Sequence, residues 1–401
     1  MLTLDAAYRR LLARAHPTEP ESVPLAEALG RVLADPKVTA AIDVPGFDNS
    51  AMDGYAVRAA DTPGGLKLAG EITAGASALR PVEPGTAVRI MTGAPIPPGA
   101  DAVVPVEIAT EADTVVEVGA AVPGDHVRLA AHDTRAGDEI CLPEALTPPM
   151  IAVLASIGIG EVRVRRRPRV AILSTGDELV DVGQALASFQ IHDANGVALA
   201  AAVREVGGEP VLLPRARDDA SEIERVLTRG ARDADLIVTS GGVSVGRHDH
   251  VRSVLETRGS LDFWRIAVQP GKPLAVGAIG GTTVIGLPGN PVSALVVFEL
   301  FVRPVVRAMS GLTGDGRLHL RATPTTRIAK DPQRRAFLRV TVWHEDGQMH
   351  ARPAGGQASS QLRPLAEANA LLAVPEGADA AEPGRSYEAI VLGPLDLAHW
   401  R

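Results

Sequence analysis

The order of hydrophobic and polar positions divides the 401-residue chain into segments of different texture. Near the start, Leu4, Tyr8, Leu11 and Leu12 recur at helical spacing, which predicts a helix, and a second short helix is expected at 24–33. Short apolar runs separated by Gly and Pro then predict a small β module. The strands expected in this module are 66–72, 87–91, 102–106 and 114–118.

The segment after the β module again contains both helix-like and strand-like patterns. A helix is expected at 148–157, where Gly158 ends the apolar run. This segment is expected to complete a first domain that the β module interrupts. The sequence therefore predicts a mixed, discontinuous N-terminal domain of residues 1–44 and 128–166, with the β module inserted at 45–127.

From residue 169 to residue 310, strand-like and helix-like segments alternate regularly, which predicts a central doubly wound α/β domain at 167–311. In such a domain ligands bind beyond the carboxyl ends of the strands. The expected strands are 170–174, 209–213, 236–239, 263–267, 274–278 and 283–287, and the expected helices are 195–206, 220–231, 250–258 and 291–309.

The last segment, 312–401, begins with a linker rich in Gly, Thr and Pro. From there to its end it has short apolar runs typical of β-strands. Strands are expected at 318–322, 337–343 and 389–392. We expect a small C-terminal β-barrel or sandwich. The fold class predicted for the whole chain is therefore multidomain α/β and β.

Composition and charge narrow the classes of function. The net charge of −8 and the absence of a basic stripe argue against a nucleic-acid-binding protein. The single cysteine, Cys141, excludes an internal disulfide framework and a cysteine-cluster metal site. The start of the chain lacks the apolar core of a signal peptide, and Glu299, Arg303 and Pro304 interrupt the longest apolar segment. We expect a cytoplasmic protein that binds neither nucleic acid nor membrane.

A glycine-rich loop follows the strand expected at 236–239, in the sequence DLIVTSGGVSVGRHD. Glycines allow backbone N–H groups to approach an anionic ligand closely. The loop therefore predicts a phosphate or nucleotide cradle, with an ordinary glycine-rich turn as the alternative. Its candidate residues are Ser240, Gly241, Gly242, Ser244, Gly246 and Asp249.

Carboxylates follow other strands of the same expected sheet. The stretch STGDEL, with Ser174, Thr175, Gly176, Asp177 and Glu178, can hold a divalent cation or a hydroxylated ligand, or it is a turn that caps a helix.

The same two interpretations apply to Asp193 and Asn195, and one of the pair Asp218 and Asp219 is expected to cap a helix. Convergence of Glu178, Asp218 and Asp249 at one sheet edge would favour magnesium with a nucleotide diphosphate or a phosphate ester.

Two rigid loops carry candidate anion donors. QPGKP contains Lys272, and GLPGNPVS ends at Ser293 near a helix start; both would suit sulfate, phosphate or molybdate. Turn chemistry without function is the alternative. In the β module, the polar loops around Asp53 and Thr92 also suggest function, although a single Asp could cap a turn.

Eight of these stretches occur in an order that resembles the molybdopterin molybdotransferase family, the MoeA-type enzymes related to the E domain of gephyrin. They are PGFDNSAMDGYAVR, RIMTGAP, ILSTGDEL, DANG, RDD, SGGVSVGRHD, QPGKP and GLPGNPVSA. The resemblance implies an L-shaped homodimer of four-domain subunits, whose active site lies between the α/β domain of one subunit and the β module of the other. It implies insertion of molybdenum from molybdate into adenylylated molybdopterin, with release of AMP.

The resemblance also implies roles for individual residues. Catalytic roles fall to Asp53, Thr92, Glu178, Asp218 and Asp249, and a magnesium or zinc ion would be held by Asp177, Glu178 and Asp249. Other cofactor-biosynthesis proteins and apo-molybdoenzymes are implied partners. The implied ligand-binding residues are Ser174, Thr175, Gly176, Asp193, Asn195, Ser240, Gly241, Gly242, Ser244, Gly246, Lys272, Pro273, Pro288, Asn290, Pro291, Ser293, Arg339 and Ser359.

The chain departs from the family pattern at three positions. Gln269 stands where the family often has lysine, which weakens the argument for an oxyanion pocket. Ala194 replaces a customary Ser or Thr, and His250 replaces an aromatic residue. Three alternatives stay open: an adenylyltransferase that acts on molybdopterin, a scaffold protein, and an oxyanion store without turnover.

Overall fold

The structure is a computed structural model that describes residues 2–75, 80–243 and 250–395. The chain forms two compact units, one of residues 22–164 and one that combines residues 1–21 with 165–401. Three of the expected site residues, Ser244, Gly246 and Asp249, lie outside the described residues.

The first unit contains the predicted β module. Its six-stranded sheet has the order β7-β4-β6-β5-β9-β8. The core of the module is built from small and β-branched residues around Tyr55, which is 1% exposed. The strands are β4 (Gly54–Val57), β5 (Gly64–Ile72), β6 (Thr86–Ile90), β7 (Ala102–Pro105), β8 (Thr110–Ala112) and β9 (Val115–Val118).

The rest of this unit packs helix α2 (Pro148–Ser156) against short strand pairs. The helix expected at 24–33 is wrong, because only one 3-10 turn forms at Leu25–Glu27 and Gly30 takes a φ of +72° that ends regular structure. The remaining pairs are β1 (Pro20–Pro24) with β12 (Glu161–Arg165), β2 (Lys37–Thr39) with β11 (Glu139–Cys141), and β3 (Asn49–Ser50) with β10 (Val127–Arg128).

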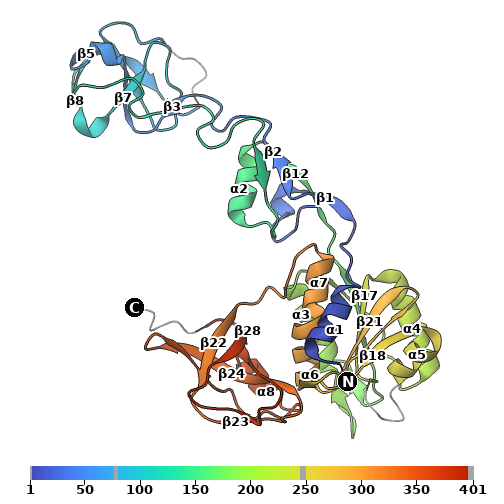
Figure 1. The fold of residues 1–401 in the computed structure, drawn as a ribbon. Helices are drawn as coiled ribbons and strands as arrows, with labels where there is room; N and C mark the ends of the chain where they lie inside the picture. The colour runs from blue at the N-terminus through green and yellow to red at the C-terminus, as the bar shows by residue number, and fades with distance from the viewer. Residues whose placement is uncertain (1, 76–79, 244–249, 396–401) are drawn as a thin grey trace. The chain divides into compact units, whose positions relative to one another are not determined.

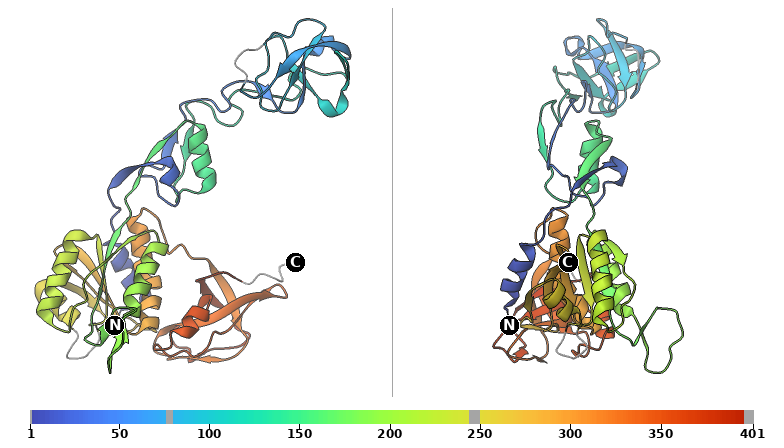
Figure 2. Two further views of the ribbon diagram at one scale, coloured as in Figure 1. Left: turned by 180° about the vertical axis from the view of Figure 1, so that it is seen from behind. Right: turned by 90° about the vertical axis from the view of Figure 1, so that its right-hand side faces the viewer.

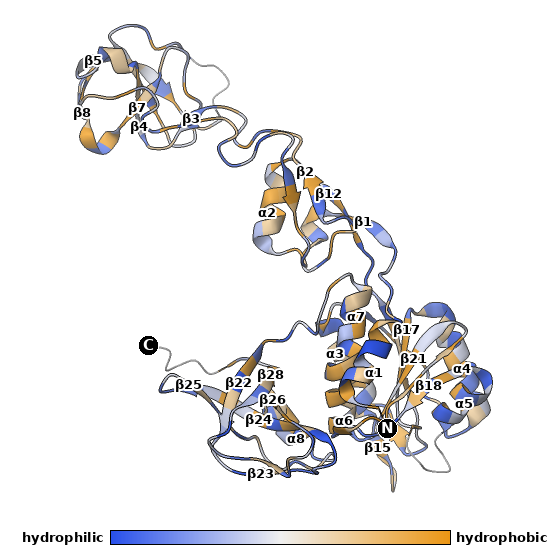
Figure 3. Cartoon of the chain, viewed as in Figure 1, coloured by the Kyte–Doolittle hydropathy of each residue, from blue (hydrophilic) through white to orange (hydrophobic). Residues whose placement is uncertain are grey.

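The second unit contains the predicted α/β domain. Its six-stranded sheet has the order β16-β13-β17-β21-β20-β18, parallel through β21 and antiparallel beyond it. In Figure 3 the hydrophobic colour runs along central strands such as β17 and β21. The strand expected at 263–267 begins three residues earlier. The strands are β13 (Arg169–Ser174), β16 (Glu209–Leu212), β17 (Leu236–Ser240), β18 (Ser260–Trp264), β20 (Ala275–Ile279) and β21 (Thr282–Leu287).

Helices cover both faces of this sheet (Figures 1 and 2). One face carries α4 (Ala220–Asp233) and α5 (His250–Arg258). The other carries α3 (Ala194–Glu205), the helix from residue 291 to 309, and α1 (Leu4–Leu12). Helix α1, which the sequence analysis grouped with the first domain, buries Ala7 and Leu11 in this core.

The helix from residue 291 to 309 contains a π-helical segment, Phe298–Val302, between α6 (Pro291–Val297) and α7 (Arg303–Met309). The N–H of Arg303 bonds to the carbonyl of Phe298, one residue further back than in an α-helix. Pro304 has no N–H and cannot continue the α pattern, which explains the change. None of the described helices is both long enough and apolar enough to cross a membrane.

The C-terminal region forms a closed barrel, as predicted. Its strands follow the order β24-β25-β22-β28-β26, and a β24–β26 pairing closes the circle. The strands are β22 (His319–Pro324), β24 (Arg335–Glu345), β25 (Gln348–Pro353), β26 (Ala370–Val374) and β28 (Tyr387–Val391). Smaller elements are β23 (Ile328–Ala329), which pairs with β27 (Ala380–Ala381), and helix α8 (Arg363–Glu367).

Strand β19 (Val268–Gln269) connects the barrel to the α/β domain. It pairs in parallel with β24, so that Val268 lies beside Arg335 and Gln269 beside Ala336. Arg335 adds a backbone hydrogen bond of 3.0 Å to the carbonyl of Ala267. The loop after β19 is therefore held against the barrel by backbone contacts.

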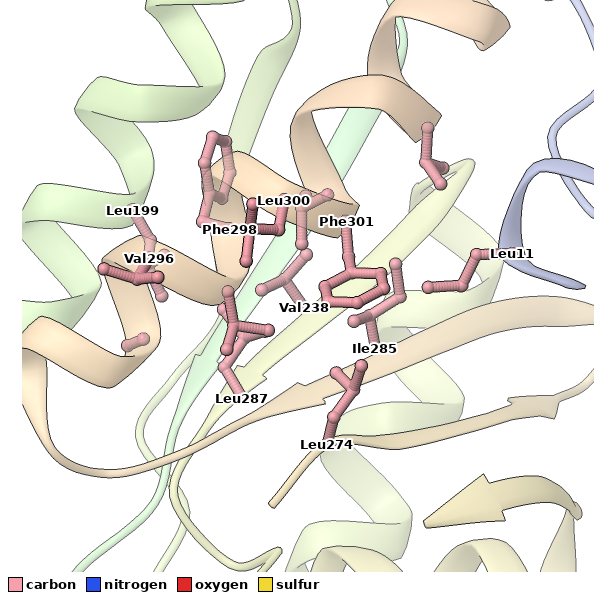
Figure 4. Close-up of a cluster of buried hydrophobic side chains, with 14 of the residues drawn as sticks. Leu11, Leu199, Val238, Leu274, Ile285, Leu287, Val296, Phe298, Leu300 and Phe301 are labelled. Carbon is pink, nitrogen blue, oxygen red and sulfur yellow. The ribbon is translucent and has the colours of Figure 1, made fainter. Parts of the chain in front are cut away.

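Phe301 is the basis of a stability prediction. It is 1% exposed and lies between the sheet and helix α1, near Ile285 and Leu11 (Figure 4). Replacing it with alanine leaves a cavity, and we expect Phe301→Ala to lower the free energy of unfolding by about 3–5 kcal/mol. Phe189→Ala is the control because Phe189 is 98% exposed. Equal denaturant midpoints for the two variants would contradict this packing.

His319 predicts a pH dependence. Its ring nitrogens lie 2.7 Å from a Glu388 oxygen and 2.8 Å from an Asp315 oxygen. Partial burial opposes its charge, but the bonds to Glu388 and Asp315 outweigh burial and raise the pKa of His319 above 6.5. This stabilisation is complete below pH 6.5 and is lost as the pH rises through the raised pKa. Urea midpoints should fall over that range, and less so in His319→Gln; identical pH profiles would contradict the assignment.

Candidate functional site

A cleft of about 850 Å³ opens at the carboxyl ends of β13 and β17. Polar loops line one wall, and the barrel loop at 357–359 lines another. Fourteen of the expected site residues line it: Thr175, Glu178, Asp193, Asn195, Ser240, Gly241, Gly242, Lys272, Pro273, Pro288, Asn290, Pro291, Ser293 and Ser359.

The position of the cleft follows from the order of the strands. Strand β13 connects through α3 to β16 on one side, whereas β17 connects through α5 to strands on the other side. Because these connections diverge, none of the described helices covers the edge between β13 and β17, and a crevice forms there. Ser174 pairs with Ser240 in the sheet, so their loops leave at the same level.

The glycine-rich loop approaches the loop after β13 at van der Waals distance. Gly241 has a φ of +96°, and a Cβ added to it would lie 2.8 Å from Thr175 Oγ1. Gly242 has a φ of +69°, and its Cβ would lie 2.9 Å from Val251 of helix α5. Both the backbone conformation and the space require glycine, and the resulting backbone can lie close to a ligand.

Asn195 joins three parts of the cleft. Its Nδ2 donates to Ser240 Oγ and to the carbonyl of Gly289, each at 2.7 Å. Asp193 caps the same helix by accepting from the N–H of Gly196 at 2.8 Å. Asp193 therefore has the capping role that the sequence left open, and it also lines the cleft.

The carboxylates after β13 lie at the rim. The Glu178 carboxylate covers Gly176, where an added Cβ would lie 2.6 Å from Glu178 Oε2. Asp177 Oδ1 accepts from the N–H of Asp218 at 3.4 Å. Asp219 caps α4 by accepting from Glu222 N at 2.9 Å, which confirms that one of the two neighbouring aspartates is a cap. Asp177 and Asp218 do not line the cleft.

The expected metal site is described only in part. No group of three His, Cys, Asp or Glu side chains that could hold a metal occurs within residues 2–75, 80–243 and 250–395. Of the expected ligands, Asp177 and Glu178 are described, and Asp249 is not. Magnesium is often bound by one or two carboxylates together with substrate phosphates, and of the two described ligands Glu178 lines the cleft.

The opposite wall carries groups suited to an anion. Lys272 lines the cleft, and its ammonium has no ion pair among the described residues. Ser293 lies in the first turn of α6 and is 4% exposed. The side-chain oxygen Oε1 of Gln269 accepts from the N–H of Asp331 at 2.9 Å, so this side chain faces the barrel.

Arg339 lies behind the cleft wall. It is 0% exposed, and its Nη2 donates to the carbonyls of Gly356 at 2.8 Å and Ala358 at 3.2 Å. Burial lowers the pKa of Arg339. It thus supports the loop that carries Ser359, whose Oγ accepts from Asn290 Nδ2 at 3.1 Å.

Two other groups of expected residues are not among the residues that line the cleft. Ser174 lines a second cavity of about 430 Å³ beside β16. In the β module, Asp53 Oδ1 accepts from Thr92 N at 2.7 Å and from Thr92 Oγ1 at 2.8 Å. The backbone bond, followed by the side-chain bond, lowers the pKa of Asp53. The structure therefore brings Asp53 and Thr92 together in the first unit.

The cleft also contains residues that the sequence analysis missed. Arg334, Gln357 and His192 line it. Arg334 follows a short turn without any motif, and no feature of the sequence marked it. Gln357 occurs in GGQASS, the segment from which only Ser359 was chosen.

Comparison with known families identifies the architecture. Residues 2–158 match the MoeA N-terminal region (domain I and II), residues 171–308 match a probable molybdopterin binding domain, and residues 321–392 match the MoeA C-terminal region (domain IV). The chain belongs to the MoeA family. The resemblance expected from the eight sequence stretches is thereby confirmed.

Individual MoeA relatives cover most of the chain. Molybdopterin molybdenumtransferase 2 of Mycobacterium tuberculosis is 43% identical over 89% of this chain and 91% of its own length. Molybdopterin molybdenumtransferase of Haemophilus influenzae is 39% identical over 93% and 94%. A crystal structure of a molybdopterin biosynthesis MoeA protein from Pyrococcus horikosii matches with a TM-score of 0.83 and 32% identity, over 98% of this chain and 100% of that one.

A prediction concerns the space available for a side chain at Gly241 in the glycine-rich loop. Gly241→Ala and Gly281→Ala both place alanine at positive φ, which costs about 1–2 kcal/mol. Gly281 has no atom within 4 Å of an added Cβ, whereas Gly241 would force Thr175 to move. We expect a larger loss of unfolding free energy for Gly241→Ala than for Gly281→Ala. Equal losses in both variants would show that the approach to Thr175 is unimportant.

Proposed function

We propose that this protein is a molybdopterin molybdenumtransferase, which inserts molybdenum from molybdate into adenylylated molybdopterin and releases AMP. The observation that carries the proposal is one cleft that combines a glycine cradle, the Glu178 carboxylate, and a lysine, Lys272, without an ion pair among the described residues. Relatives of that name, 39% and 43% identical, support it.

The phosphate end of the substrate binds at the glycine loop. The backbone at Gly241 and Gly242 can approach phosphate oxygens because no Cβ intervenes. Ser240 Oγ accepts from Asn195, so its own hydrogen is free to donate to the ligand. Thr175, on the facing loop, adds a second hydroxyl.

A divalent cation, magnesium or zinc, would be held by Asp177, Glu178 and Asp249 together with phosphate oxygens. When bound, it would neutralise charge on the phosphoanhydride and so favour departure of AMP. Glu178 keeps a carboxylate at the cleft rim, where it can orient an attacking water or oxyanion. No covalent nucleophile is needed.

The oxyanion end of the cleft lies at Lys272 and Ser293. The lysine offers three N–H donors and a full charge, and the hydroxyl of Ser293 lies at the start of a helix. Pro273, Pro288 and Pro291 fix the surrounding backbone, so the donors need little reordering on binding.

Assembly and partners complete the proposal. A homodimer would bring the Asp53 and Thr92 pair of one subunit to the cleft of the other, as the family resemblance implies. The molybdenum-loaded product would pass to apo-molybdoenzymes in the cytoplasm, with other cofactor-biosynthesis proteins upstream.

The proposal predicts AMP release that depends on molybdate. Purified protein, adenylylated molybdopterin and magnesium should release AMP faster with molybdate than without it, and the product should activate an apo-molybdoenzyme. Lys272→Gln should raise the KM for molybdate roughly tenfold, because a hydrogen bond to a charged group is lost. Lys37→Gln is the control, since Lys37 pairs with Glu139 in the other unit.

Each of the other outcomes would indicate a different function for this protein. Formation of adenylylated molybdopterin from ATP would indicate an adenylyltransferase. Molybdate binding without AMP release would indicate an oxyanion store, and neither binding nor release would leave a scaffold role.

A further inference from the structure

A tryptophan outside the cleft is bonded to the backbone of the glycine-rich loop. Trp264 is the last residue of β18 and is not among the residues that line the cleft. Its indole Nε1 donates a hydrogen bond of 2.7 Å to the carbonyl of Val243. Val243 follows Gly242 in the glycine-rich loop and lines the cleft. Trp264 therefore contacts the loop without forming part of the cleft wall.

The direction of the strands brings Trp264 to the edge of the sheet from which the loop leaves. Strand β18 is antiparallel to β20, and β20 is antiparallel to β21, so β18 runs in the same direction as β21 and β17. The carboxyl ends of β17 and β18 thus lie at the same edge of the sheet. Strands β21 and β20 separate them in the sheet order, and the bond from Trp264 to Val243 spans that separation.

Two arginines hold the indole ring. The Cζ atoms of Arg252, on α5, and of Arg265 each lie 3.9 Å from the centroid of the Trp264 ring. A guanidinium at this distance is attracted by the negative potential over the indole face. Arg252 Nε also donates to Glu256 Oε1 at 2.9 Å, one turn further along α5. The ring that bonds to Val243 is therefore fixed by contacts of its own.

Two consecutive carbonyls of the loop are bonded to the domain behind it. The carbonyl of Gly242 accepts from the N–H of Arg252 at 3.4 Å, and the carbonyl of Val243 accepts from Trp264. Because the peptide unit is planar and trans, the N–H of Val243 points away from the carbonyl of Gly242. Among the described residues, no partner occupies the N–H of Gly242 or of Val243. The bonds to the carbonyls thus orient N–H groups that an anion can use.

The side chain of Val243 is fixed as well. It is 1% exposed, and a Cβ added to Gly286 of β21 would lie 2.5 Å from Val243 Cγ1. The loop is therefore held at this residue both by packing against β21 and by the bond from Trp264. A binding loop held in this way needs little reordering when its ligand arrives.

We propose that Trp264 is a positioning residue for the nucleotide end of the substrate. Its indole N–H holds the carbonyl of Val243, and so keeps the glycine-rich loop in the conformation that receives the phosphate group. The ligand class is a nucleoside monophosphate or its anhydride, and the inference rests on the proposed function of the same cleft. Arg252 acts one step further back, because it fixes the ring of Trp264.

The test compares variants of these two residues in the full-length protein. Trp264→Phe removes the N–H donor and keeps a flat ring beside the arginines, whereas Arg252→Met removes the guanidinium and keeps the tryptophan. The first measurement is AMP binding by titration calorimetry, which does not require turnover. The second is KM and kcat for AMP release from adenylylated molybdopterin, and the third is the urea midpoint of each variant.

We expect Trp264→Phe to weaken AMP binding about fivefold, because a neutral hydrogen bond that orders the loop is lost. The KM for adenylylated molybdopterin should rise by a similar factor, with kcat within about twofold of the wild type. Arg252→Met should weaken AMP binding about twofold. It should have little further effect in the double variant, because it acts through the N–H that Trp264→Phe has already removed.

Trp343→Phe is the matched control. Trp343, in β24, donates its Nε1 to Glu345 Oε2 at 3.0 Å, and Cζ of Arg352 lies 5.6 Å from its ring centroid. It does not line the cleft. AMP affinity should equal that of the wild type in this variant, because Trp343 has no bond to the glycine-rich loop.

Unchanged AMP affinity in Trp264→Phe, with or without a lower urea midpoint, would overturn the inference by leaving Trp264 a purely structural role. An equal loss in Trp343→Phe, or no AMP binding to the wild type, would overturn it as well. If Trp264→Phe does not fold, unchanged AMP affinity in Arg252→Met overturns it. AMP binding that Trp264→Phe weakens, without any molybdate-dependent release by the wild type, would count against the proposed function and support the inference.

Discussion

The register between β13 and β17 is the constraint on which the site depends. Ser174 lies beside Ser240, and Thr175 N donates to the carbonyl of Ser240 at 3.1 Å, so two polar loops leave the sheet together. The connections of these strands diverge at this point, which leaves the loops uncovered. A shift of one residue would turn Ser240 and its neighbours to the opposite face. The glycine cradle and the Asn195 bonds both require this register.

A second, smaller contact brings the barrel into the site. The two-residue strand β19 pairs with β24, and Asn290 bonds to Ser359 across the same junction. These contacts place Arg334 and the loop supported by Arg339 beside Lys272. The α/β domain alone would offer a phosphate cradle and one lysine. The barrel adds Arg334, Gln357 and Ser359 to the residues that line the cleft.

Much of the fold could be predicted because the spacing of hydrophobic residues indicates which positions of a helix or strand are buried. The parallel strands contain continuous apolar runs, such as residues 236–238 of β17, a strand that is buried throughout. The helix expected at 24–33 failed because its apolar residues pack around one turn before Gly30, and spacing alone does not show where a chain turns. The π segment at Phe298–Val302 was also missed, since it depends on the hydrogen bonds around Pro304.

Within the cleft, most lining residues that belong to sequence motifs could be predicted, whereas Arg334, Gln357 and His192 could not. Glycine loops and helix caps can be recognised from a few neighbouring residues in the sequence, as Gly241 and Asp219 show. Arg334 lies 62 residues after Lys272, on a turn without a signature, and only the pairing of β19 with β24 brings them together. Gln269 was interpreted as a lost cation, whereas the structure shows an acceptor for the barrel backbone.

The most direct test of the account is to locate molybdate on the protein. Crystals soaked with molybdate can be measured at the molybdenum absorption edge, where anomalous scattering marks the metal alone. The account predicts a peak inside the cleft, within hydrogen-bonding reach of Lys272. A peak on another surface, or none at saturating molybdate, would contradict the assignment of this cleft as the site of molybdenum insertion.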